Sequence, residues 1–194
     1  LPSLGYDDYS TFLRIGSARD YARFTGVDQL TWWKKLVQHP AYDAFWQGQA
    51  LDAVMANTPL QVPTMWLQGL WDQEDMWGAN HAYQAMEGRD TGNTHNYLVM
   101  GPWRHSQVNY SGSELGALKF DGDTALQFRR DVLKPFFDQY LVDGAPKADT
   151  PPVLVYNTGE NHWDRLQGWP RSCETNCTAA SKPLYLRGGG KLAV

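Results

Sequence analysis

Two short apolar runs with a helical stretch between them constrain the fold of this chain more than any other feature. The runs cover residues 62–72 and 95–105, and each reaches a glycine near its end, Gly69 in the first and Gly101 in the second. Between them, apolar residues recur at helical spacing over residues 78–87. A strand, a helix and a second strand in this order predict a βαβ unit, and therefore an α/β fold with a parallel sheet.

Two polar residues stand where these predicted strands end. Asp72 closes the first run and His105 closes the second. Ligands of parallel sheets bind beyond the carboxyl ends of the strands, so we expect both side chains at one edge of the sheet. A structural interpretation has Asp72 capping the following helix and His105 as a hydrogen-bonded loop histidine. The alternative interpretation is catalytic.

The catalytic interpretation is that of a serine hydrolase. Hydrolytic acyl transfer by serine needs a nucleophile, an imidazole that takes its proton, and a carboxylate that fixes the tautomer of the imidazole. In α/β-hydrolases these groups follow the chain order Ser, Asp, His, which Asp72 and His105 keep. The nucleophile motif G-x-S-x-G is absent from the sequence, and the nearest imitation, residues 112–116, has the wrong spacing.

Helical patterns flank the two strands. Residues 6–57 carry several short, Trp-rich helical stretches, which Pro40 and Pro59 interrupt. Such a succession suits a cap over a core, or a plain helical subdomain. After the second strand, the pattern predicts a longer helix over residues 124–142, in which Pro135 introduces a kink or a new start.

A Pro-rich stretch over residues 143–152 marks the clearest domain boundary. Beyond it, residues 153–166 and 182–187 contain short strand-like runs separated by turn residues, which predict an antiparallel β domain. These strands are too few to close a sandwich or a jelly roll. We therefore expect the β domain to be incomplete in this sequence.

Composition and cysteine usage narrow the function classes. The net charge of −4, without a run of Lys or Arg, argues against nucleic acid as a partner. A membrane is not expected as a partner either, because no apolar stretch approaches the roughly 20 residues of a membrane-spanning helix. Cys173 and Cys177 favour a local disulfide in an oxidising compartment over free thiols, and zinc is not expected. Residues 121–123 are interpreted as a turn, so we expect neither a metal nor another cofactor.

The residues around Asp72 and His105 resemble one group of serine hydrolases. The resemblance is carried by PTMWLQGLWDQEDMWGA, HNYLVMGPWRHS, FFDQYL and PPVLVYNTGENHW, and by the helical stretch that begins GYDDYSTFLRIG. In combination these segments resemble the cocaine esterase and X-prolyl dipeptidyl peptidase group, and within it the α-amino acid ester hydrolases. The resemblance covers nearly the whole chain.

This resemblance implies both architecture and activity. It implies a helical cap over residues 1–57, the C-terminal part of an α/β-hydrolase core over 58–145, and the start of a jelly-roll domain over 146–194. The implied activity is hydrolysis of α-amino acid esters with acyl transfer to β-lactam nuclei. Asp72 and His105 match the triad aspartate and histidine of the family. The serine would precede residue 1, so we expect an internal fragment that is inactive alone.

Asp43 is the candidate for substrate binding that the resemblance supplies. The family binds the ammonium group of its substrate through a carboxylate cluster, part of which comes from the cap. The alternative for Asp43 is a helix N-terminal aspartate that interacts with the dipole. Glu74 and Asp75 are further acidic candidates, although capping of the next helix is favoured for them. Three tryptophans could line an acyl pocket, with core packing favoured for at least two: Trp71, Trp77 and Trp103.

Two rival functions stay open. One is a cocaine-esterase-like or dipeptidyl-peptidase-like hydrolase without selectivity for an amino group, and the other is a non-catalytic, aromatic-rich binding module. For the hydrolase, the expected partners are an amino acid ester or β-lactam substrate and the remainder of the same polypeptide, with a homo-oligomer left open. A periplasmic or secreted location is expected.

Overall fold

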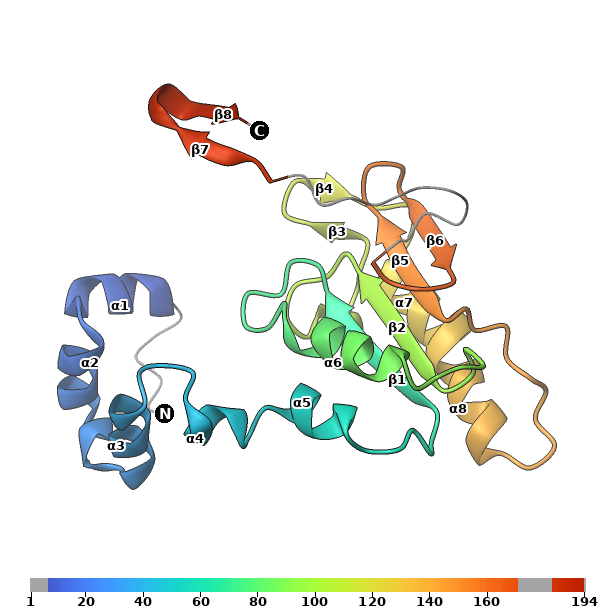
Figure 1. The fold of residues 1–194 in the computed structure, drawn as a ribbon. Helices are drawn as coiled ribbons and strands as arrows, with labels where there is room; N and C mark the ends of the chain where they lie inside the picture. The colour runs from blue at the N-terminus through green and yellow to red at the C-terminus, as the bar shows by residue number, and fades with distance from the viewer. Residues whose placement is uncertain (1–6, 171–182, 194) are drawn as a thin grey trace. The chain divides into compact units, whose positions relative to one another are not determined.

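The computed structural model describes residues 7–170 and 183–193, and the chain divides into two compact units, residues 1–50 and 51–194 (Figure 1). The first unit is helical throughout its described part. Its elements are α1 (Asp8–Ile15), α2 (Ala18–Thr25), the 3₁₀ helix η1 (Val27–Gln29), α3 (Thr31–Gln38) and α4 (Ala44–Gln47).

The helices of the first unit are short because caps and glycines mark their ends. The Asp7 carboxylate and the Ser17 hydroxyl each accept a backbone N–H from three residues further along the chain, at 3.0 Å. These bonds satisfy donors that a helix N-terminus leaves free. Gly26 ends α2 with a φ of 74°, a left-handed conformation that glycine adopts readily. The predicted succession of short helices is therefore confirmed for the described residues.

A four-stranded sheet with the order β1-β2-β5-β6 organises the second unit (Figure 1). β1 (Thr64–Gly69) pairs in parallel with β2 (Asn96–Gly101), which pairs in parallel with β5 (Val153–Asn157). β6 (His162–Leu166) pairs antiparallel with β5. Because α6 (Gly78–Glu87) connects β1 to β2, the predicted βαβ unit and the α/β class are confirmed.

Helices cover both faces of this sheet, and β2 lies buried between them. Leu98 and Met100 of β2 pack with Tyr83 of α6 on one face. Val99 points to the opposite face and packs with Phe128, as the alternation of side chains along a strand requires. The helices of this unit are α5 (Leu51–Ala56), α6, η2 (Gln107–Asn109), α7 (Thr124–Phe128), the π-helical η3 (Arg129–Leu133) and α8 (Lys134–Leu141).

The helix predicted over residues 124–142 is present, but it is divided. Regular α-helix gives way to the π-helical turn of η3 before α8 begins, with Pro135 in the first turn of α8. A proline has no N–H to donate to the preceding turn, so the regular hydrogen-bond ladder is interrupted at this point. Of the kink or new start predicted at Pro135, the structure shows a π-helical interruption just before it. The backbone stays in the right-handed helical region at Leu133 and Lys134, so the helix does not start anew.

The strands after the Pro-rich linker join the sheet of the core. β5 and β6 pair antiparallel, as the sequence predicted, but β5 also pairs in parallel with β2. The linker returns the chain to the start of β2, where the Leu98 N–H donates to the Pro152 oxygen at 2.9 Å. Val153 and Leu154 are then buried in the core on the two faces of the sheet. The domain boundaries expected at 57/58 and 145/146 stay predictions.

Two hairpins complete the described secondary structure. β3 (Glu114–Leu115) pairs with β4 (Leu118–Lys119), and β7 (Tyr185–Arg187) pairs with β8 (Lys191–Ala193) across η4 (Gly188–Gly190). The expected disulfide between Cys173 and Cys177 lies outside the described residues. Within the described ranges, no helix is long and apolar enough to cross a membrane.

Gly101 has no room for a side chain, which yields a stability prediction. A Cβ at this position would collide with the indole ring of Trp103, a fully buried side chain. We expect Gly101→Ala to lower the free energy of unfolding by about 1–3 kcal/mol, the cost of overpacking a filled core. The change would be measured as a lower urea midpoint of the complete protein. Gly88→Ala is the control, because nothing lies within 4 Å of its Cβ, and an equal loss in both variants would contradict the argument.

Candidate active site

β1 and β2 end at the same level of the sheet, and this determines where the residues that follow them lie. Gly69 and Gly101 are partners in the parallel register and close the two strands. Backbone pairing continues past them: Leu70 N–H donates to the Gly101 oxygen at 2.9 Å, and Trp71 N–H donates to the Trp103 oxygen at 3.0 Å. The two loops that follow the strands are therefore held side by side.

The glycines at the strand ends allow this close approach. A Cβ on Gly69 would come within 2.7 Å of the Trp103 carbonyl oxygen, so a side chain there would push the two loops apart. After β2, the Trp103 N–H donates to the Gly101 oxygen at 2.8 Å and closes a three-residue turn. The sequence Gly101-Pro102 thus turns the chain directly after the buried strand, as predicted.

Asp72 and His105 meet where these loops run together. The His105 Nδ1 lies 3.0 Å from Oδ2 and 3.2 Å from Oδ1 of Asp72. Because an ionised carboxylate only accepts, this contact favours the tautomer in which Nδ1 carries the proton and Nε2 is free. The Asp72 side chain is 14% exposed and that of His105 is 45% exposed. The aspartate is thus enclosed, while the imidazole remains accessible.

Asp72 is held ionised by its surroundings. Burial raises the pKa of its carboxyl group, but the backbone N–H groups of Glu74 and Asp75 and the ring of His105 together bring the pKa below its ordinary value. The two N–H groups donate to Oδ1 at 2.8 and 3.2 Å. Asp72 therefore supplies a fixed negative charge beside Nδ1, and it also orders the loop that leads to α6. The structural and catalytic interpretations of this residue are compatible.

The loop after β2 is fixed by glutamines that sequence reasoning did not single out. The Gln73 Oε1 accepts the His105 N–H at 3.4 Å. Gln107 is 7% exposed, accepts the Arg104 N–H, and donates to the backbone oxygens of Ser111 and Glu114. A buried amide with this many partners holds the histidine loop in one conformation. In the sequence, Gln107 is marked only as a polar residue two positions after His105. That pattern is too common to have identified its role.

Glu74 and Asp75 take different roles. Asp75 accepts the N–H groups of Trp77 and Gly78 at 2.8 and 2.7 Å, so its predicted place at the start of α6 is confirmed. The Glu74 carboxylate instead lies 3.8 Å from the Nε2 of His105, and its side chain is 63% exposed. An accessible carboxylate therefore stands beside the free nitrogen of the imidazole.

Only one of the three tryptophans near Asp72 and His105 is packed in the core, whereas the sequence predicted at least two. Trp103 is buried, with its Nε1 donating to Thr124 Oγ1 at 3.0 Å, and it packs in the core. Trp71 and Trp77 are 40% and 64% exposed, so core packing for at least two of the three is wrong for this structure. Their place beside surface loops, outside the helix–sheet layers, is the physical reason. One face of the Trp77 ring stacks on His81 of α6, so only the Trp71 ring and the other face of Trp77 remain open to an apolar ligand.

Asp43 belongs to the first unit, whereas Asp72 and His105 belong to the second. Its Oδ1 accepts the Phe45 N–H at 2.9 Å at the start of α4, and its Oδ2 lies 2.7 Å from the His39 Nδ1. The bond with the His39 ring lowers the pKa of Asp43. The helix-capping role weighed for this residue is confirmed, and its role toward a substrate ammonium stays a prediction.

The acidic turn at residues 121–123 is a place where the sequence raises the question of a metal. Groups of three or more His, Cys, Asp or Glu that could hold a metal ion are absent from the part of the chain that the structure describes. In the turn at 121–123, Asp123 accepts the N–H groups of Gly112 and Leu126 at 2.7 and 3.0 Å and begins α7. That turn is accounted for by its backbone contacts.

A mostly parallel sheet between helices, with an aspartate and then a histidine after successive strands, is the arrangement of an α/β-hydrolase core. Comparison with known proteins agrees. A profile of the X-Pro dipeptidyl-peptidase family (S15) matches residues 2–107, more than half of the sequence. The chain belongs to this family.

Two solved structures resemble the chain closely. An α-amino acid ester hydrolase labelled with selenomethionine is 75% identical, with a TM-score of 0.86 over 98% of this chain and 31% of its own. An aminopeptidase from a marine sediment archaeon, a Thaumarchaeota archaeon, is 42% identical, with a TM-score of 0.82 over 99% of this chain and 30% of its own. No curated protein matches. The chain thus spans about a third of the length of these relatives.

Proposed function

We propose that the complete protein is a serine hydrolase that cleaves α-amino acid esters and transfers the acyl group to the amine of β-lactam nuclei. The observation that carries the proposal is the Asp72–His105 pair, with Nδ1 on the carboxylate and Nε2 free, at the ends of adjacent parallel strands. The 75% identity to an α-amino acid ester hydrolase supports this substrate class.

The proposed architecture follows the same likeness. Residues 1–57 would form part of a helical cap, residues 58–145 part of the hydrolase core, and residues 146–194 the start of a jelly-roll domain. The remainder of the polypeptide would supply the serine and the groups that stabilise the oxyanion. A periplasmic or secreted location is part of the proposal.

In the proposed mechanism, His105 moves the protons. Its Nε2 accepts the proton of the serine hydroxyl as the serine oxygen bonds to the ester carbonyl carbon, and Asp72 stabilises the resulting imidazolium. The same nitrogen then gives the proton to the leaving alcohol, which leaves an acyl-enzyme. Water or the amine of a β-lactam nucleus attacks the acyl-enzyme with His105 again as base, which releases the acid or the amide and restores the serine.

We further propose Glu74 as a carboxylate that receives the substrate ammonium. It is accessible and stands 3.8 Å from Nε2 of His105, where the reacting carbonyl must come. In an α-amino acid ester the ammonium is bonded to the carbon next to that carbonyl, so a carboxylate near Nε2 is within its reach. Asp43 remains the other proposed ammonium residue, although its carboxylate already has the partner His39.

Substitution distinguishes these two carboxylates. We expect Glu74→Gln to reduce kcat/KM for an α-amino acid ester about tenfold relative to the matching ester without the amino group, because about 1.4 kcal/mol of ammonium recognition is lost. Asp43→Asn is the matched charge change in the other unit. If only Asp43→Asn loses the preference for esters with an amino group, Asp43 and not Glu74 binds the ammonium. If both variants keep this preference, neither carboxylate recognises the amino group.

The direct test of the function is a product assay on the complete protein. Phenylglycine methyl ester would be supplied with and without a β-lactam nucleus that bears a free amine. We expect free acid in the first case, and additional amide between the acyl group and the nucleus in the second. Hydrolysis without any amide product would contradict the proposed acyl transfer. If the ester is not hydrolysed at all, both proposed activities are contradicted.

Aminopeptidase action is the second candidate. It is favoured by the 42% identity to a structure named as an aminopeptidase and by the family match to dipeptidyl-peptidases. The same pair of residues serves amide hydrolysis, since the imidazole protonates an amine leaving group as it does an alcohol. Comparison of kcat/KM for an amino acid ester and for a dipeptide with the same first residue separates the two candidates.

A further inference from the structure

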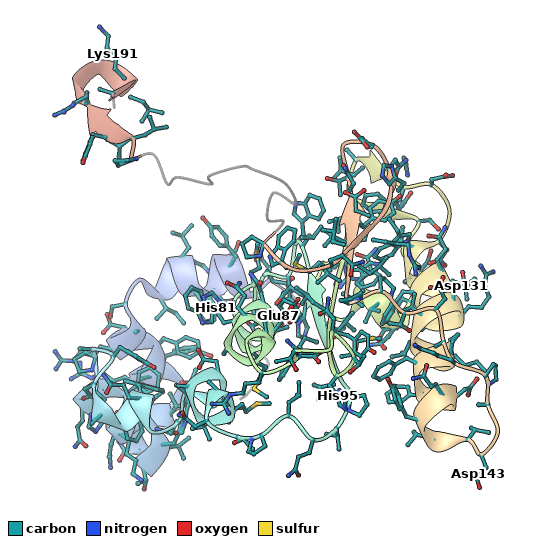
Figure 2. The ribbon with its side chains drawn as sticks, turned by 45° about the vertical axis from the view of Figure 1, so that its right-hand side comes forward. His81, Glu87, His95, Asp131, Asp143 and Lys191 are labelled. Carbon is teal, nitrogen blue, oxygen red and sulfur yellow. The ribbon has the colours of Figure 1, made fainter. Side chains whose placement is uncertain are left out.

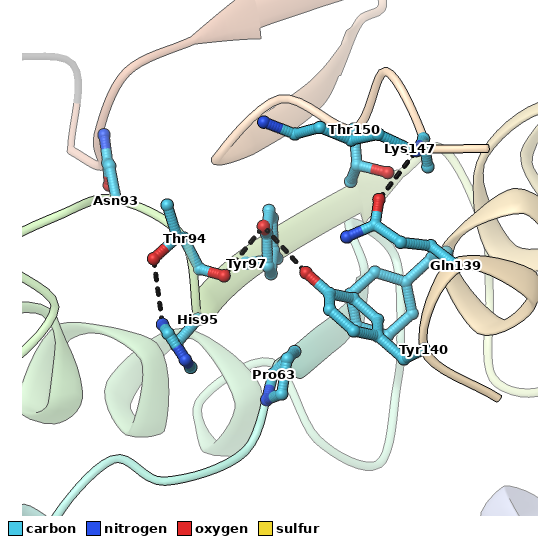
Figure 3. A pocket seen from close by; sticks show the side chains of 11 residues that line it. Pro63, Asn93, Thr94, His95, Tyr97, Gln139, Tyr140, Lys147 and Thr150 are labelled. Atoms are coloured by element: carbon cyan, nitrogen blue, oxygen red, sulfur yellow. Dashed lines mark hydrogen bonds between the residues drawn. The ribbon is translucent and has the colours of Figure 1, made fainter. Parts of the chain in front are cut away.

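A cavity of about 330 Å³ lies at the other end of β2 from Asp72 and His105. Its walls are the loop that enters β2, one side of α8 and the linker that follows α8 (Figure 3). β2 is six residues long, so roughly 20 Å of strand separates this cavity from the catalytic pair. The mechanism proposed above does not use it.

Two tyrosine hydroxyls meet in the cavity. Tyr97 is 8% exposed and its hydroxyl donates to the Thr94 oxygen at 3.0 Å. The Tyr140 hydroxyl donates to that of Tyr97 in a long hydrogen bond of 3.4 Å, because the proton of Tyr97 is already on the Thr94 oxygen (Figure 3). Because this bond is long and therefore weak, Tyr140 can redirect its proton to a ligand oxygen. A tyrosine hydroxyl is protonated at neutral pH, and burial raises the pKa of Tyr97 further above its ordinary value.

Further donors come from α8 and the linker. The Gln139 Oε1 accepts the Ala148 N–H at 2.6 Å, which directs the amide NH₂ of Gln139 the other way, toward the cavity (Figure 3). Lys147 lines the cavity and adds an ammonium charge. Among the described residues that line the cavity, none carries a carboxylate. The side chains that line the cavity thus combine a positive charge with neutral N–H and O–H donors. Behind the wall, the Asp90 carboxylate is close enough to raise the pKa of Tyr97.

The wall that carries Thr94 and His95 is preorganised. The Asp90 carboxylate accepts the backbone N–H groups of Thr94, His95 and Asn96 at 3.1, 2.8 and 2.8 Å. His95, labelled in Figure 2, stands at the end of this loop, directly before β2. These three hydrogen bonds fix the backbone of the loop.

We propose that this cavity binds a small organic carboxylate with an apolar body. The carboxylate would accept from the Lys147 ammonium and the Tyr140 hydroxyl, since charge-assisted bonds of this kind are the strong ones. The apolar body would lie against Phe136 and Pro63, which line the same cavity. Concave sites with an apolar wall and a few polar groups are typical of small-ligand binding, and this one is partly open, with Tyr140 39% exposed.

Calorimetric titration of the complete protein with sodium benzoate tests this site. We expect saturable binding that weakens at least tenfold in Lys147→Met and also weakens in Tyr140→Phe, with little binding of the neutral analogue benzamide. Lys147 is exposed, so its replacement should leave the fold intact. Lys134→Met is the matched control: it removes a lysine of α8 that does not line the cavity, and it should leave the affinity unchanged.

His105→Ala separates this site from the catalytic one. We expect the variant to bind benzoate as the parent protein does, because the histidine lies beyond the opposite end of β2. Loss of benzoate binding in His105→Ala, equal weakening in Lys147→Met and Lys134→Met, or no saturable binding to the parent protein would each overturn the proposal. The outcome is independent of whether the proposed esterase activity is found.

Discussion

Replacement of His105 by alanine is expected to reduce the kcat of ester hydrolysis by the complete protein about 10⁶-fold, the scale of losing the general base of a serine hydrolase. The physical reason is that the serine hydroxyl is a weak nucleophile until an imidazole takes its proton. In the structure, His105 is placed for this work because its Nδ1 is engaged by Asp72 and its Nε2 is accessible.

A second histidine–carboxylate pair provides the control for this experiment. The His162 Nε2 lies 2.9 Å from Asp164 Oδ1 in the hairpin of β5 and β6, and His162 is half-exposed like His105. We expect His162→Ala to keep its kcat. Activity would be followed by release of the ester's alcohol, with circular dichroism to verify the fold of both variants. A His105→Ala protein that hydrolyses esters normally would falsify the assignment of the general base.

Replacement of Asp72 by asparagine is expected to lower kcat about 10⁴-fold while the fold is kept. An asparagine can donate its NH₂ to Nδ1, which stabilises the tautomer with the proton on Nε2 and blocks the base. It also removes the negative charge that stabilises the imidazolium. The parent and variant would be compared by kcat at neutral pH, with Asp164→Asn as the matched control that keeps its activity.

The pH dependence of stability gives an independent check on Asp72. Its pKa in the folded protein is below the ordinary aspartate value of 3.8, so its ionised form contributes stability that is present above pH 3.8 and is lost as the pH falls through the lower, folded pKa. We expect the urea midpoint of the parent protein to exceed that of Asp72→Asn near neutral pH, with the gap closing below pH 3.8. A gap that stays constant with pH would show that the carboxylate charge is not what stabilises this loop.

The sequence alone predicted the elements that carry the candidate site. Short apolar runs identified both strands and helical spacing identified the helix between them, and the predicted bounds of residues 78–87 coincide with α6. The order of the polar residues after the strands placed Asp72 and His105 at one edge of the sheet. This prediction worked because parallel strands in a βαβ unit end at the same edge, so the geometry follows from local pattern and chain direction.

Other features could not be predicted because they depend on contacts between distant residues. The addition of β5 to β2 depends on how the linker folds back, which composition does not encode. The position of Glu74 beside Nε2 of His105 depends on the loop that the backbone N–H groups of residues 74 and 75 form around Asp72. Turn residues and charges alone indicated only that Glu74 and Asp75 would precede a helix.

The sequence by itself determined the α/β class, the strand ends and the candidate catalytic pair, because hydrophobic periodicity and glycine positions act locally along the chain. Only the tertiary structure decided the second cavity, in which Tyr97, Tyr140 and Lys147 come from a strand, a helix and a linker. Side chains this far apart in sequence meet only after the core has packed, since packing, and not local propensity, fixes which surfaces face each other.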